Sequence, residues 1–94
     1  MRLPRKINAG GIEWTVKQHR VKRPRNLGQL DYKSGTLHIY SDAGAKLQTC
    51  CHEMVHAWLN AIGQVELSDD EAFVDSLASQ VATTIETWGA RSEE

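Results

Sequence analysis

The segment AGAKLQTCCHEMVHAWLNAI, residues 43–62, constrains the fold of this chain more than any other. Its apolar residues at positions 47, 50, 51, 54, 55, 58, 59 and 62 cover most of a helix circumference. Such a helix must be buried on more than one side, so the remaining elements have to pack around it. We expect it to begin after Ser41 and Asp42, which can cap a helix, and to end at Gly63. Its polar exceptions form one stripe, namely Gln48, Thr49, His52, Glu53 and His56.

Patterns typical of strands precede this helix, and a second helical pattern follows it. GIEWTVK, residues 11–17, alternates apolar and polar residues, which predicts a half-buried strand in a hairpin with Ile7 across the Gly10-Gly11 turn. LGQLDYKSGTLHIY, residues 27–40, predicts a second hairpin with its turn at 33–35. SDDEAFVDSLASQVATTIETW, residues 68–88, predicts a helix that Ser68 opens and that ends near Gly89. Strands first and helices last indicate the α+β class.

A chain of 94 residues corresponds to one domain, residues 1–94. No apolar run approaches the ~18 residues of a membrane span, and the first residues lack a signal core. We therefore expect a cytoplasmic protein with no membrane partner. The only cysteines, Cys50 and Cys51, are neighbours that point about 100° apart on a helix, so a disulfide between them would be strained. We expect both to face the core as small hydrophobic residues rather than to bind metal.

Within the polar stripe, HEMVH has the pattern HExxH. On a helix His52 and His56, four residues apart, lie on one face and can bind one zinc ion together. Glu53 follows His52, so its carboxylate can reach a water at that ion and accept its proton. The pattern can also arise by chance, but here it lies within a buried helix, where such side chains need partners. The sequence therefore predicts a site for one zinc ion.

A third protein ligand has to come from another segment, because a catalytic zinc site has three. The short connection 63–67 makes the second helix a neighbour of the first, and the start of that helix is rich in acids. We choose Glu71 as the third ligand. Asp75, one turn later, can accept a hydrogen bond from the outer nitrogen of a ligand histidine. Two alternatives stay open, namely Asp70 as the ligand and Glu71 in a capping box with Ser68.

The charges are unevenly distributed along the chain. Residues 1–30 contain eight Lys and Arg against one acid, whereas residues 31–94 contain three against eleven. The basic residues are densest in KQHRVKRPR, residues 17–25, which we expect to form a loop. This segment can contact nucleic acid, but it lacks interleaved aromatic residues, so a solvated loop is the simpler interpretation. We expect His19 and His38 to be surface or packing residues.

HEMVH followed by EAFVD resembles the HExxH and ExxxD motifs of the gluzincin metallopeptidases. LGQLDYKSGTLHI, LQTCCHEMVHAWLNAIG and LSDDEAFVDSLASQV resemble the ImmA/IrrE-type metallopeptidases over residues 7–82, especially short phage and prophage versions. The resemblance implies a zincin-like fold, with a small, mostly antiparallel sheet of three to four strands packed on the HExxH helix and then a C-terminal helix. It also implies that His52, His56 and Glu71 bind zinc and that Glu53 is the base. The chain departs from the family in its two adjacent cysteines, where aliphatic residues are common.

These features predict a zinc-dependent endopeptidase that hydrolyses a protein or peptide substrate with Glu53 as general base. By family analogy the substrate would be a transcriptional repressor. Oxyanion stabilisation has three candidates, His38, Tyr40 and Tyr32, and residues 36–40 are a candidate edge strand for an extended substrate. The alternative is a non-enzymatic module that zinc stabilises, in contact with nucleic acid through residues 17–25.

Overall fold

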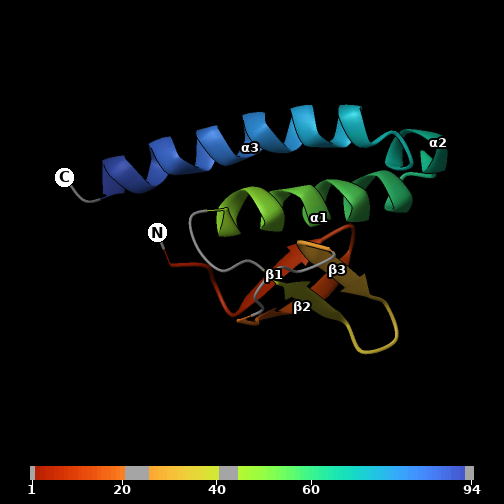
Figure 1. Cartoon of the computed structure of the whole chain (residues 1–94), viewed down its shortest axis with the longest axis horizontal. Coiled ribbons are helices and arrows are strands. Elements are labelled where there is room, and N and C mark those ends of the chain that lie inside the picture. Colours follow the sequence, from red (N-terminus) through yellow and green to blue (C-terminus); the bar gives the residue numbers. More distant parts are fainter. Residues whose placement is uncertain (1, 21–25, 41–44, 93–94) are drawn as a thin grey trace.

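The computed structural model describes residues 2–20, 26–40 and 45–92 and has an α+β fold, as predicted. Four strands come first in the described part of the chain: β1 (Lys6–Ala9), β2 (Ile12–Gln18), β3 (Gly28–Asp31) and β4 (Thr36–Ile39). Three helices follow: α1 (Lys46–Ala61), α2 (Val65–Ser68) and α3 (Glu71–Ser92). Figure 1 shows that they form three layers, with α1 between the sheet and α3. Among these described helices, none has the length and apolarity to cross a membrane.

The four strands form one mixed sheet in the order β1-β2-β4-β3. Both predicted hairpins are confirmed, because β1 pairs antiparallel with β2 and β3 pairs antiparallel with β4. The hairpins are joined by a parallel pairing of β2 with β4, in which Val16 lies opposite Leu37. This pairing places β4 inside the sheet and leaves β3 at its edge. The prediction of an edge strand at residues 36–40 is therefore wrong, since hydrogen bonds occupy both sides of β4.

The alternation predicted for β2 is confirmed by the burial of its side chains. Trp14 is fully buried, whereas its neighbours Glu13 and Thr15 are exposed. In β4, Leu37 and Ile39 are also fully buried. Because successive side chains of a strand point to opposite faces, these residues lie on the inner face, which packs on α1.

Helix α1 is buried on two sides, as its apolar pattern requires. The sheet-side cluster contains Leu3, Ala9, Trp14, Leu37, Ile39, Cys50 and Ala57. The helix-side cluster contains Cys51, Val55, Leu59, Val74, Ala78 and Ala82. The two cysteines are free and buried, one in each cluster, as expected for small hydrophobic residues about 100° apart on a helix.

The start of the C-terminal helix differs from the prediction. Ser68 is the last residue of the short helix α2, and α3 begins at Glu71. The Asp70 carboxylate accepts a hydrogen bond from the Phe73 backbone N–H at 3.1 Å, which is the contact of an N-cap. The predicted start of this helix at Ser68 is therefore wrong, and so is the alternative of a capping box of Ser68 with Glu71. The predicted caps of α1, at positions 41 and 42, lie outside the described residues.

Candidate metal centre

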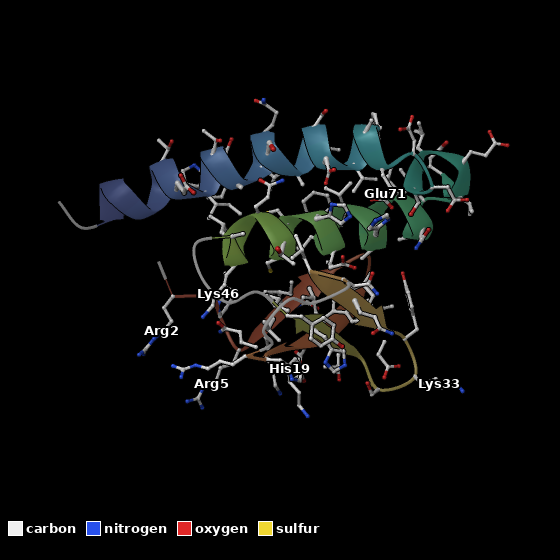
Figure 2. All side chains as sticks on the ribbon, viewed as in Figure 1. Arg2, Arg5, His19, Lys33, Lys46 and Glu71 are labelled. Carbon is white, nitrogen blue, oxygen red and sulfur yellow. The ribbon has the colours of Figure 1, made fainter. Side chains whose placement is uncertain are left out.

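Two histidines of α1 and one glutamate of α3 converge at the predicted site. The Nε2 atom of His52 lies 3.1 Å from Nε2 of His56 and 3.1 Å from Oε2 of Glu71. The Nε2 atom of His56 lies 3.5 Å from Oε1 of Glu71. Figure 2 shows Glu71 at the start of α3, next to α1. These three residues form a group that could hold a metal ion, with ligand atoms all within 4.8 Å of one another.

The outer nitrogen of each histidine has its own partner. Nδ1 of His52 lies 2.7 Å from Oδ1 of Asp75, the partner predicted for a ligand histidine. Nδ1 of His56 lies 2.8 Å from Oγ of Ser68. The sequence alone does not reveal this role of Ser68, because a serine three residues before a glutamate also matches a capping box. Both contacts fix the imidazole rings so that their Nε2 atoms face each other and Glu71.

The tautomers that these partners allow make the centre suitable for a cation. The Asp75 carboxylate can only accept, so Nδ1 of His52 carries a hydrogen and Nε2 of the neutral ring carries a lone pair. The Ser68 hydroxyl can accept from His56 in the same way. In the tautomer in which Ser68 accepts, two lone pairs and a carboxylate face one another, an arrangement that a positive charge between them stabilises. One additional proton on His52 would satisfy one of the three contacts, whereas a metal ion satisfies all three.

The spacing of the donor atoms also fits zinc. Zinc binds imidazole nitrogens and carboxylate oxygens at about 2.0–2.2 Å in tetrahedral geometry, so two ligands of one ion are about 3.3 Å apart. The separation of the two Nε2 atoms, 3.1 Å, and that of His52 Nε2 from Glu71 Oε2, 3.1 Å, are close to that value, whereas the 3.5 Å contact of His56 is with the other carboxylate oxygen, Oε1. Two nitrogens and one oxygen are a donor set that zinc accepts, and a catalytic zinc site has three protein ligands.

Glu53 lies beside these residues without belonging to the ligand group. Its residue is 8% exposed, and burial raises the pKa of its carboxyl, with the charge of Glu71 acting in the same direction and His52 opposing. The backbone of β3 passes close to it: a Cβ atom at Gly28 would lie 3.1 Å from Cγ of Glu53 and 2.8 Å from Cγ2 of Thr49. Glycine at position 28 therefore allows β3 to cover the Glu53 side chain.

A cavity of about 650 Å³ gives access to the centre. Glu53 and the three residues of the ligand group line it on the helix side. The opposite wall comes from β3 and the residues around it, including Gly28, Leu30 and Tyr32. Exposure differs within the ligand group, since the Glu71 side chain is 63% exposed and that of His52 is 21% exposed. The centre is thus open toward β3, the edge strand of the sheet.

Of the three oxyanion candidates, the structure brings one to this cavity. Tyr32 lines the cavity, and the Asn60 side chain donates a hydrogen bond to its hydroxyl at 3.1 Å. The ring of Tyr32 packs edge-on against Trp14, with centroids 5.1 Å apart. Asn60 follows His56 by one helical turn, a relation visible in the sequence only once Tyr32 is known to be near. His38 and Tyr40 instead pack against His19 on the other side of the sheet.

The remaining candidates lie apart from the centre or have other tasks. Asp70, the alternative third ligand, caps α3. Cys50 is buried in the sheet-side cluster and does not belong to the ligand group, and burial raises the pKa of its thiol to about 12. The basic segment begins within β2, because Lys17 and Gln18 are strand residues, and its positions 21–25 lie outside the described residues.

Comparisons with models of known protein families, with curated proteins and with solved structures found no match to this chain.

Proposed function

We propose that this protein is a zinc-dependent endopeptidase that acts in the cytoplasm on a protein or peptide substrate. The observation that carries the proposal is the convergence of two histidine Nε2 atoms and the Glu71 carboxylate beside the buried carboxyl of Glu53, at the wall of an open cavity. The resemblance of HEMVH and EAFVD to gluzincin motifs supports the same activity. By that resemblance, the substrate is a transcriptional repressor. Two free cysteines are consistent with a reducing compartment.

The proposed reaction needs a base, and Glu53 is placed to act as one. A zinc ion held by His52, His56 and Glu71 would supply Lewis acidity, which acidifies a water and polarises a carbonyl. Glu53 accepts the proton of the attacking water and delivers it to the leaving nitrogen. Burial raises the pKa of the Glu53 carboxyl, so its carboxylate is a stronger base than that of an exposed glutamate.

We assign to Tyr32 the stabilisation of the negative charge that develops on the carbonyl oxygen of the substrate. Asn60 donates to the Tyr32 oxygen, so the phenolic hydrogen remains free to donate into the cavity. A donor held in advance by packing on Trp14 stabilises charge without reorganisation during the reaction.

We propose that the substrate backbone binds along the edge strand β3. It pairs with β4 on one side, so its other side can pair with an extended peptide next to the cavity. An extended segment there would pass between β3 and the residues of α1 that face the cavity. This assignment replaces the earlier expectation for residues 36–40.

The alternative function is a module that zinc stabilises without catalysis. A structural zinc site is usually closed by four protein ligands. Here the group contains three residues within the described part of the chain, and Glu71 is 63% exposed beside the cavity. The openness of the centre and the buried Glu53 favour catalysis.

The test combines metal analysis with peptide cleavage for wild type and Glu53→Gln. We expect wild type to bind one zinc ion and to cleave members of a broad peptide library. Glu53→Gln should retain the zinc and lose cleavage by a factor of about 10²–10⁴. Glu66→Gln, which changes an exposed acid of α2, is the matched control and should cleave like wild type. Loss of zinc in Glu53→Gln to the level of His52→Ala would contradict the assignment of Glu53 as base.

A further inference from the structure

The outer face of the sheet, which turns away from α1, is an exposed surface with its own group of side chains. All three helices lie on the other side of the sheet in Figure 1. In the pairing register, Lys17 of β2 lies opposite His38 of β4, and His38 lies opposite Gln29 of β3. This row alternates with the buried Leu37 and Ile39, so it belongs to the outer face.

Three aromatic rings gather at one end of this face. His19, just after β2, stacks on Tyr40 with centroids 5.0 Å apart, and His38 stacks on Tyr40 at 5.7 Å with ring planes 4° apart. Nε2 of His19 lies 2.9 Å from Nδ1 of His38, and the Tyr40 hydroxyl donates to Gln29 at 3.3 Å. The parallel pairing of β2 with β4 creates this group, because it brings residues about twenty positions apart side by side. We call His19, His38 and Tyr40 the aromatic group.

Two exposed cations adjoin the aromatic group, one by strand register and one by sequence. Lys17 is exposed in the row next to His38, and Arg20 is exposed directly after His19. Figure 2 shows Arg5 and His19 on the same side of the molecule, away from Glu71. In residues 2–20, 26–40 and 45–92, neither Lys17 nor Arg20 forms a salt bridge.

The outer face also has two carboxylates, Glu13 and Asp31, and both have partners. Glu13 forms a salt bridge with Lys6 at 3.4 Å. Asp31 accepts hydrogen bonds from the backbone N–H groups of Lys33 and Ser34 in the β3–β4 turn. Asp31 pairs with Thr36, two residues along β4 from His38, and its charge acts on His38. The charge of Asp31 therefore offsets part, but not all, of the positive charge that Lys17 and Arg20 contribute near the aromatic group.

We propose that this end of the outer face binds single-stranded nucleic acid. Unpaired bases can stack on the aromatic group while Lys17 and Arg20 contact phosphates, the combination by which sheet surfaces bind single strands. A flat sheet face does not enter the major groove of a duplex as a helix or a two-stranded ribbon does, so the single strand is the better fit. The basic segment contributes only the ring of His19, but His38 of β4 and Tyr40, directly after β4, supply the other two rings. The proposal does not depend on the metal centre.

The first test measures the affinity of the full chain for a fluorescent oligonucleotide of deoxythymidine or uridine by anisotropy at low salt. We expect binding in the micromolar range that falls with salt, at a slope of about −0.7 per phosphate neutralised. Tyr40→Val, which keeps a strand-forming residue, should weaken binding by about 5- to 100-fold. Lys17→Gln combined with Arg20→Gln should reduce the magnitude of the salt slope by about 1.4. Comparing the two oligonucleotides determines whether DNA or RNA is preferred.

Matched controls and alternatives make this test decisive. Phe73→Val removes an exposed aromatic ring on α3, and Lys33→Gln removes a cation at the other end of the sheet. Both should bind like wild type. His19→Gln provides a second aromatic-group variant if thermal melting shows that Tyr40→Val is unfolded. The proposal is overturned by absence of binding, by equal binding of Tyr40→Val and His19→Gln, by preference for duplex, or by equal competition from polyglutamate, which would indicate a site for any polyanion.

Discussion

Nδ1 of His52 and Oδ1 of Asp75 lie 2.7 Å apart and connect the centre of α1 to the first turns of α3. The contact joins a residue of the candidate metal centre to a carboxylate outside it, and it determines which nitrogen of the ring faces the cavity.

Replacement of this carboxylate tests its part in metal binding. Asp75→Asn keeps the size of the side chain but removes the charge that favours a hydrogen on Nδ1. We expect zinc affinity to fall by about 10- to 100-fold, measured by competition with a chromophoric chelator. Glu66→Gln is the control, because Glu66 is an exposed acid of α2 outside the ligand group. Equal affinities for Asp75→Asn and wild type would show that the contact does not orient a ligand.

The neighbouring acids Asp70 and Glu71 should respond differently to loss of charge. Glu71→Gln removes the carboxylate of the proposed third ligand, so zinc binding should fall sharply and the zinc-dependent gain in melting temperature should fall with it. Asp70→Asn should retain zinc and stability, because asparagine can also accept the Phe73 N–H. Calorimetric titration with zinc of both variants distinguishes the two roles. If Asp70→Asn lost zinc while Glu71→Gln kept it, the third ligand would be Asp70.

The close packing of Gly28 predicts an effect on Glu53, the proposed base. An alanine Cβ there would lie 2.8 Å from Thr49 and 3.1 Å from Glu53, so one of these groups has to move. We expect Gly28→Ala to lower the free energy of unfolding by about 1–3 kcal/mol, as overpacking does. Cleavage should fall while zinc content is unchanged, since no ligand is touched. Urea denaturation and a peptide-cleavage assay provide the two measurements, and unchanged cleavage would contradict the inferred position of Glu53.

His38 should make the fold sensitive to acid. Burial, and then the nearby His19, lower the pKa of His38 below the ordinary value of 6.5. Between the folded and unfolded pKa values the unfolded chain binds more protons, so stability is lost as pH falls below about 6.5. His38→Gln should therefore reduce the difference in urea stability between pH 8 and pH 5, measured with chelator present. An unchanged or larger difference would show that His38 is not responsible.

The cysteines should be inert in the folded protein. Cys50 and Cys51 are both buried, and burial raises the pKa of each thiol, so alkylation by iodoacetamide should require unfolding. Cys50→Ala and Cys51→Ala should each cost about 1–2 kcal/mol of stability through lost packing. Zinc content should stay at the wild-type level in both variants, and a zinc-free variant would place a thiolate among the ligands.

The sequence was sufficient for the features that depend on local patterns. Gly10, with φ of 63°, and Gly35, with φ of 65°, mark the turns of both hairpins, because glycine adopts this backbone region without strain. The helical period around HEMVH placed His52 and His56 on one face, and the apolar residues on both sides of this stripe predicted a helix buried on two sides.

The remaining features depend on contacts between distant segments. The residue patterns of β2 and β4 do not indicate which strands pair. The edge position of β3 and the contacts within the aromatic group therefore could not be predicted from the sequence. The start of α3 was ambiguous for a related reason. Ser68 and Asp70 are both residues that commonly cap helices. In the structure the Ser68 hydroxyl contacts Nδ1 of His56, and Asp70 caps α3 instead.

The placement of α1 between two apolar clusters has a consequence for how fast a metal ion would enter and leave. His52 and His56 stand on the helix that is packed most completely, so their positions should change little as the protein fluctuates. Glu71 comes from the first turn of α3, where the side chain is exposed and the helix can fray. Exchange of the ion would then follow the opening of that one turn, and the lifetime of the loaded state would be governed by residues 69–71 rather than by the histidines.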